Sequence, residues 1–190
     1  MSRLARRVIA VTGVIALLGL GSYAIAGGGS KNFKDVRLTG YEENPDVSTV
    51  ATGSFEARVS DNGTSLHYKL SYSGLEGTVT QSHVHFGKRA INGGISFWLC
   101  ETATNQSPSA STPACPAPGG TVEGDITAAE VLGPVAQGIE PLNFAEIVAA
   151  MRAGHVYANV HSTKWPGGEI RAQLKRRHGD GDHRGGKDDD

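Results

Sequence analysis

Long apolar segments are scarce in this 190-residue chain. The strict apolar run near the N-terminus, residues 8–20, has 13 residues, whereas a membrane-spanning helix needs roughly 20. A basic head precedes this run and the sequence Ala-Ile-Ala follows it, so residues 1–26 are predicted to be a secretory signal peptide cleaved after Ala26. An uncleaved membrane anchor is the alternative. We therefore expect a secreted or extracytoplasmic protein, in a periplasm or at a cell surface, with no stable membrane span after signal cleavage.

Basic residues are slightly outnumbered. The chain has 18 Lys and Arg against 19 Asp and Glu, and cleavage would remove three arginines, leaving 15 against 19. The remaining sequence has no basic stripe interleaved with aromatic residues, the pattern typical of a nucleic-acid-binding surface. The expected partner is therefore an unknown protein or surface component, and not a nucleic acid.

Cysteine is equally sparse, because the chain contains only Cys100 and Cys115. In an oxidising compartment a disulfide between them is the expected state. The segment between them is rich in Ser, Thr, Ala, Pro and Gly, and a loop of this length needs a restraint to stay ordered in a compact domain. Two free thiols or a cysteine metal pair are the alternatives.

Motifs of hydrolytic enzymes are missing as well. The sequence has neither a G-x-S-x-G elbow nor an H-E-x-x-H helix. Ser82 and His83 are adjacent, so on a strand they point to opposite faces and cannot act as nucleophile and base. Glu169 and Arg171 share a face of the last predicted strand and are interpreted as a surface pair. No catalytic residue is assigned, and the chain is not expected to be an enzyme.

Alternation of apolar and polar residues predicts an antiparallel β-sandwich. In residues 53–60, for example, Phe55, Ala57 and Val59 alternate with polar residues, and an Asp-Asn-Gly turn follows. This strand and the next are expected to form a hairpin with one face in water. The predicted strands cover residues 36–40, 53–60, 65–73, 79–87, 93–101, 121–126, 155–161 and 169–174.

One short helix, Phe144–Ala153, is predicted directly before the penultimate strand. Asn143 is a capping residue, Gly154 follows the end, and the apolar residues recur at helical spacing. The ends of the chain lack such patterns. Residues 27–34 are expected to be a linker, residues 176–190 a disordered charged tail, and residues 35–175 a single domain.

Histidines are concentrated on two of these strands. His83 and His85 alternate with apolar residues in 79–87, so both imidazoles leave the face that packs in the core. His155 and His161 do the same in 155–161. Imidazole nitrogens suit copper or zinc. The sequence therefore predicts a metal site with His83, His85 and His161 as ligands and His155 as a fourth or neighbouring group.

The alternative for these histidines is structural. Their rings would hydrogen-bond to one another, to Asn159 and to loop carbonyls, and would thereby fix loops over a polar sheet face. The sequence does not decide between the two.

Five motifs follow one another along residues 38–174. They read L-T-G-Y-E-E-N-P-D-V-S-T-V-A-T-G at 38–53, L-x-Y-x-L with S-G-L at 66–75, S-H-V-H-F-G at 82–87, G-x-I-T-A-A-E at 124–130 and H-V-Y-A-N-V-H-S-x-x-W-P-G-G-E-I-R-A-Q-L at 155–174. In this order they resemble the CHRD domain, the module named after chordin. The resemblance implies an all-β, immunoglobulin-like sandwich in an extracytoplasmic setting. The growth-factor binding of chordin does not carry over to a chain with one such domain.

The H-V-H segment followed by Phe-Gly also resembles the copper-binding strand of copper/zinc superoxide dismutase, another β-sandwich. The sequence lacks the spaced histidines of that enzyme's zinc loop, so a dinuclear site cannot be assembled. Three functions remain open. The first is a secreted binding module that holds one copper or zinc ion, the second a metal-free structural or adhesion module at the cell surface, and the third a redox enzyme of the dismutase type.

Overall fold

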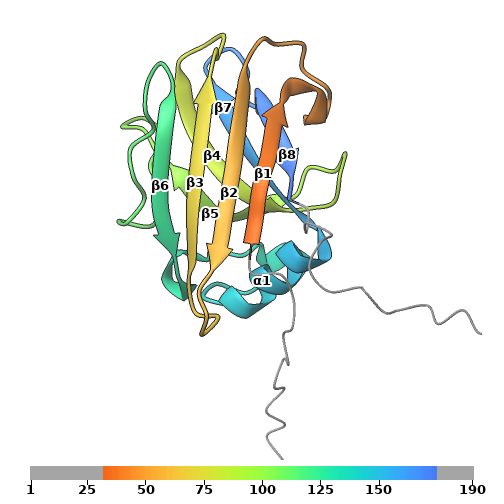
Figure 1. The fold of residues 1–190 in the computed structure, drawn as a ribbon, viewed down its shortest axis with the longest axis vertical. Coiled ribbons are helices and arrows are strands. Elements are labelled where there is room, and N and C mark those ends of the chain that lie inside the picture. Colours follow the sequence, from red (N-terminus) through yellow and green to blue (C-terminus); the bar gives the residue numbers. More distant parts are fainter. Residues whose placement is uncertain (1–31, 175–190) are drawn as a thin grey trace, which may run out of the picture.

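The computed structural model describes residues 32–174, so the predicted signal peptide and the charged tail lie outside the described residues. Within this range the chain forms eight antiparallel strands and one α-helix (Figure 1). The strands are β1 (Asn32–Thr39), β2 (Thr52–Val59), β3 (Leu66–Ser73), β4 (Val79–Phe86), β5 (Gly94–Cys100), β6 (Gly120–Ile126), β7 (Val156–Ser162) and β8 (Ile170–Gln173). None of the helices in this part of the chain is long and apolar enough to cross a bilayer. The predicted all-β class is confirmed.

The strands form two layers. Their hydrogen-bonded order is β5-β4-β7-β8-β1-β2-β3-β6, and in Figure 1 β6, β3, β2 and β1 lie in front of β5, β4, β7 and β8. We call these groups the front layer and the rear layer. Within residues 32–174, β8 and β1 are paired at one position only, where Thr39 lies opposite Arg171. The fold is therefore a β-sandwich whose layers meet at this seam.

The front layer follows the alternation of the sequence. In β2, Phe55, Ala57 and Val59 are buried between more exposed residues. The following turn contains Gly63 with φ of 73°, a left-handed conformation that glycine adopts without steric cost. β3 then returns antiparallel to β2 with Leu66 opposite Val59. The predicted hairpin with one wet face is confirmed.

The apolar core lies between the two layers. Leu38 and Phe55 of the front layer and Val84, Val160 and Ile170 of the rear layer are all fully buried in it. Because side chains alternate along a strand, the residues between these point away from the core. The core therefore decides which side of the rear layer the histidines occupy.

The helix α1 (Phe144–Ala153) closes one end of the sandwich (Figure 1). The side chain of Asn143 accepts a hydrogen bond from the backbone N–H of Glu146, and Gly154 ends the helix in the left-handed conformation. The four residues of its apolar stripe are buried, namely Phe144, Ile147, Val148 and Met151. The helix lies where the sequence predicts it, and it delivers the chain into β7.

Cys100 and Cys115 form a disulfide. Cys100 ends β5, and the loop beyond it folds back so that the backbone N–H of Cys115 donates to the carbonyl of Glu101. The Glu101 side chain also accepts from the backbone N–H of Ser107. The bridge and these bonds order the long loop, as predicted.

The rear layer differs from the front one, because β7 and β8 are buried at every position. Three loops, 40–51, 87–93 and 163–168, cover the side that faces away from the core. Contacts with that side include Thr49 to Glu169, Arg171 to the carbonyl of Ile91, and His161 to the carbonyl of Pro166. We call this side the covered face.

The prediction that Glu169 and Arg171 form a surface pair is wrong. Their exposed fractions are 0% and 1%, and they have different partners. Glu169 accepts from Thr49, whereas Arg171 donates to the carbonyls of Lys88 and Ile91. Alternation shows which face a residue takes but not whether loops cover that face.

The first strand also differs from its expected limits. β1 begins at Asn32, inside the segment expected to be a linker and four residues before the predicted start of this strand. It pairs with β2 from Asn32 onward, across an irregularity between Phe33 and Val36. The irregularity interrupts the alternation there, which hides the start of the strand in the sequence.

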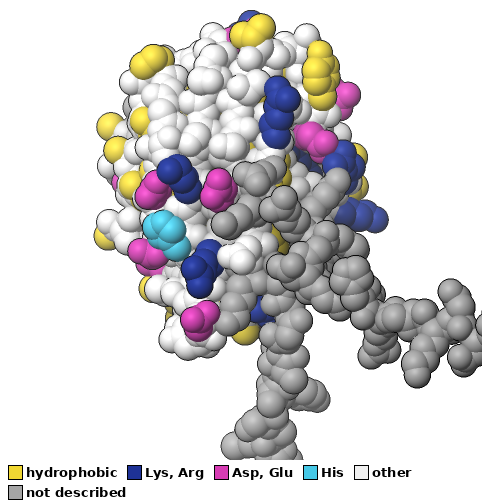
Figure 2. Space-filling model, viewed as in Figure 1, with side chains coloured by type: hydrophobic (Ala, Val, Ile, Leu, Met, Phe, Trp, Pro, Cys, Tyr) yellow, Lys and Arg dark blue, Asp and Glu magenta, His cyan; other side chains and the backbone are white. Residues whose placement is uncertain are grey.

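The outer face of the front layer is open to water. Lys69 forms an ion pair with Glu123 at 3.1 Å, and His67 lies 3.0 Å from Asp125. On the side in view, basic and acidic side chains are interleaved (Figure 2). This wet face is the counterpart of the covered face.

Candidate metal centre

Three of the four predicted histidine ligands come together on the covered face. His83 and His85 lie on β4 and His161 on β7, and one ring nitrogen from each lies within 4.8 Å of the others. The two strands are paired so that His83 is opposite Asn159 and His161 is opposite Gln81. This register places His161 diagonally beside His83. We call these three residues the histidine cluster.

His155 is not part of the cluster. It lies directly before β7 and is exposed, and its carbonyl accepts from the backbone N–H of Gly87. His67 is exposed on β3 and lies 3.0 Å from Asp125. Neither residue belongs to the histidine cluster.

The nitrogen positions in the cluster resemble those of metal ligands. His83 Nδ1 lies 3.3 Å from His161 Nε2. Metal–nitrogen bonds of roughly 2.0–2.1 Å in a tetrahedral site place two ligand nitrogens about 3.3 Å apart. The ring centroid of His83 lies 5.0 Å from that of His161 and 5.4 Å from that of His85. The cluster is therefore compact enough for one ion.

Loop carbonyls fix the orientation of two of the rings. His85 Nδ1 lies 3.0 Å from the Gly93 carbonyl oxygen, and His161 Nδ1 lies 2.9 Å from that of Pro166. A carbonyl oxygen only accepts, so in each ring Nδ1 carries the proton and Nε2 of the neutral ring has the lone pair. Histidines that bind metals usually donate their second nitrogen to a carbonyl or carboxylate in this way.

The same contacts agree with the structural alternative. His83 can donate to His161, and His161 Nε2 is also 3.1 Å from Asn159 Oδ1. However, Nε2 of His83 and Nε2 of His85 are buried and have no hydrogen-bond partner within the described residues. A buried nitrogen without a partner is costly. Hydrogen bonds alone therefore do not complete the cluster.

Burial lowers the pKa of every histidine in the cluster. The pKa of His83 falls from 6.5 to about 2, first because burial disfavours the charged ring and then because His161 and His85 lie beside it. The pKa of His85 falls to about 4, mainly through burial, and burial also lowers the pKa of His161. The rings are therefore neutral near pH 7, the form that binds metal ions.

Aromatic side chains line the cluster. The ring of Trp98 is perpendicular to that of His83 at a centroid distance of 4.3 Å. The ring of Tyr157 stacks on that of His85 at 4.7 Å, and the guanidinium of Arg171 lies 3.3 Å from the Tyr157 ring centroid. These contacts restrict the rotation of the imidazoles.

Two polar groups of the covered face were not predicted as site residues. Arg171 holds the loop 88–92 over the cluster through its backbone contacts. Glu43, from the loop after β1, is buried, and burial raises its pKa to about 7 although Arg171 and Asn159 act in the opposite direction. Arg171 shares a face with Gln173 on the strand beside β7, a pattern that could have indicated it. For Glu43 the sequence holds no such signal.

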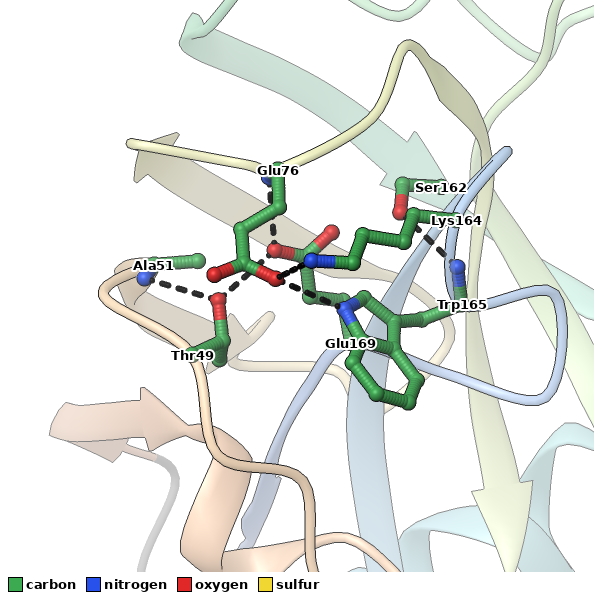
Figure 3. Close-up of polar contacts among 7 residues, drawn as sticks. All are labelled: Thr49, Ala51, Glu76, Ser162, Lys164, Trp165 and Glu169. Carbon is green, nitrogen blue, oxygen red and sulfur yellow. Dashed lines mark hydrogen bonds and ion pairs between the residues drawn. The ribbon is translucent and has the colours of Figure 1, made fainter.

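The loop that carries Pro166 is anchored by a second set of polar contacts (Figure 3). Glu169 Oε1 accepts from Thr49 Oγ1 and from the backbone N–H of Glu76, both at 2.8 Å. Glu76 Oε2 in turn accepts from Lys164 Nζ at 2.6 Å and from Trp165 Nε1 at 3.1 Å. These bonds hold the loop whose carbonyl orients His161.

The described residues thus form an antiparallel β-sandwich with a loop-covered polar face and a buried histidine cluster. Comparison with protein families gives a match to the CHRD domain over residues 35–174. The chain therefore belongs to the CHRD-domain family, as the sequence motifs predict. Neither the curated proteins nor the solved structures gave a match.

Proposed function

We propose that this CHRD domain is an extracytoplasmic binding module that holds one copper or zinc ion in its histidine cluster. The ligands are His83, His85 and His161, which are buried and neutral and whose nitrogens lie within 4.8 Å of one another. Imidazole nitrogen is a good ligand for both metals. The disulfide and the family support a location outside the cytoplasm.

The unpartnered Nε2 of His85 is the observation that carries the proposal, because this buried nitrogen has no hydrogen-bond partner within residues 32–174. A network that served only to fix loops would pair its buried nitrogens, because each unpaired one costs free energy. A bound ion removes this cost at His85 and replaces the proton shared between His83 and His161. The carbonyls of Gly93 and Pro166 then keep the lone pairs directed at the ion.

The test is metal binding by the untagged secreted chain with His178→Ala and His183→Ala in the tail, which removes histidines outside the described residues. Elemental analysis and titration with Zn(II) or Cu(II) should show one equivalent of tightly bound metal. His83→Ala and His161→Ala should each abolish tight binding. His67→Ala and His155→Ala are the matched controls and should bind like the parent, since both residues are exposed.

A metal-free structural or adhesion module is the second candidate. The contact of His83 with His161 and the two loop carbonyl bonds favour it. It becomes the better explanation if the parent protein binds no stoichiometric metal. Superoxide turnover by the metal-loaded protein would instead favour the third candidate, a redox enzyme.

A further inference from the structure

A fourth atom that could bind a metal ion lies beside the histidine cluster. Asn159 is on β7, two residues before His161, so its side chain projects from the same face of the sheet. Only 2% of the residue is exposed. Its Oδ1 lies 3.1 Å from His161 Nε2.

These two atoms are both acceptors. His161 donates Nδ1–H to the Pro166 carbonyl, which leaves the lone pair of the neutral ring on Nε2. An amide oxygen has lone pairs as well. The lone pairs of two acceptor atoms 3.1 Å apart repel each other unless a proton or a cation lies between the atoms or beside both.

The amide oxygen of Asn159 is directed at the histidines, since Oδ1 is the atom that lies 3.1 Å from His161 Nε2. Asn159 is also opposite His83 in the ladder between β4 and β7, so its side chain lies between the two strands that carry the cluster.

Four donor atoms thus converge on one volume. His161 Nε2 lies 3.3 Å from His83 Nδ1 and 3.1 Å from Asn159 Oδ1. His85 contributes a nitrogen within 4.8 Å of those of His83 and His161, and its Nε2 is unpartnered within residues 32–174. Separations of about 3.3 Å are those of ligand atoms around a tetrahedral ion.

We infer that Asn159 Oδ1 is the fourth ligand of the metal centre proposed above, which makes that centre closed, with three nitrogens and one oxygen. Structural zinc sites have four protein ligands, whereas catalytic sites leave one position to water or substrate. The ion in this domain therefore has a structural role and not a catalytic one. The amide oxygen, a harder ligand than sulfur or imidazole, favours a divalent ion over Cu(I).

The inference rests on the proposed function, and Co(II) provides the probe. The full chain with the two tail substitutions described above is loaded with Co(II) in place of the native metal, and its visible absorption is recorded with and without azide. The parent should show the intense bands of four-coordinate Co(II), and azide should not change them, because the site has no open position.

Asn159→Ala should open the site. Its affinity for Zn(II) should fall about tenfold or more, in line with losses seen around metal sites, and azide should now shift the Co(II) spectrum. Asn159→Asp keeps an oxygen at the same place, so it should stay insensitive to azide and bind at least as tightly as the parent. Because aspartate is nearly isosteric, this variant remains informative if Asn159→Ala is poorly folded.

Gln173→Ala is the matched control. Gln173 is a buried amide on β8 that donates to the carbonyls of Gly87 and Gly154, so its loss should leave the Co(II) spectrum unchanged. An azide-sensitive parent, or an Asn159→Ala variant with the affinity and spectrum of the parent, would overturn the inference while the three-histidine site stands. A parent that binds neither Co(II) nor Zn(II) would overturn both proposals.

Discussion

The two layers of the sandwich share one core but have opposite outer faces. The outer face of the front layer, with Lys69 and Glu123, lies in water. The outer face of the rear layer, with the histidine cluster, is covered by loops and almost fully buried. Polar residues therefore alternate with apolar ones in both layers, but only in the rear layer do they need specific partners. The covered face is where a polar substitution should matter most.

The largest expected effect is the response of the covered face to acid. Each buried histidine has a folded-state pKa below its unfolded value, so the unfolded chain binds protons that the folded chain does not. The free energy of unfolding should then fall as the pH drops below 6.5, by up to about 1.4 kcal/mol per pH unit for each ring.

Chemical unfolding in a metal chelator between pH 7 and pH 5 measures this loss. His85→Phe keeps a ring stacked on Tyr157 but removes one titrating group, so its profile should be flatter. An identical slope in parent and variant would mean that the histidines do not drive the acid sensitivity.

Arg171→Leu should be the next most damaging change. It leaves Glu43 as an unbalanced buried carboxyl and removes the donor to the carbonyls of Lys88 and Ile91. Loss of one partner from a buried charged network costs about 3–5 kcal/mol. Denaturant unfolding gives the value. Arg58→Leu, at an exposed position of the front layer, should change stability by no more than about 0.5 kcal/mol.

Glu43→Gln should act in the direction opposite to the histidines. The pKa of Glu43 is raised from 4.5 to about 7, so its stabilising contribution is present below pH 4.5 and is lost as the pH rises through 7. The stability of the variant relative to the parent should therefore increase with pH across this window, by at most about 3 kcal/mol. A constant difference between the two unfolding profiles would show that Glu43 is ionised throughout.

Lys69→Ala should have the smallest effect. Its ion pair with Glu123 spans 3.1 Å, but both side chains are about half exposed, at 50% and 49%. Exposed pairs contribute about 0–1 kcal/mol and are weakened by salt. Thermal unfolding at low and high salt measures the pair. A loss as large as that of Arg171→Leu would remove the distinction between the two faces.

Much of the fold is readable from the sequence because local rules agree there. Asn143 and Gly154 mark the ends of α1, and the apolar stripe between them fixes its length. The alternation along each strand predicts that the rings of His83, His85 and His161 point away from the core. The register of β4 and β7 then places them together.

The covered face could not be read in the same way. Whether Arg171 meets water depends on loops that are 80 or more residues away in the sequence. Glu43 is buried, with its carboxylate against the distant Gly168, and no alternation in its own loop reflects this contact. Alternation would place His155 on the same face as His161. His155 precedes β7, however, where the chain has just left α1, and so it is not part of the histidine cluster.

Arg171 also belongs to the seam between the layers, where it is the backbone partner of Thr39. The ladder is thinnest at this point, so local opening of the sandwich should begin there and expose amides to hydrogen exchange. The same residue clamps the loop that faces the histidine cluster. An ion bound in the cluster would therefore slow exchange at the seam. The exchange rate of the amides there would then show whether the histidine cluster holds an ion.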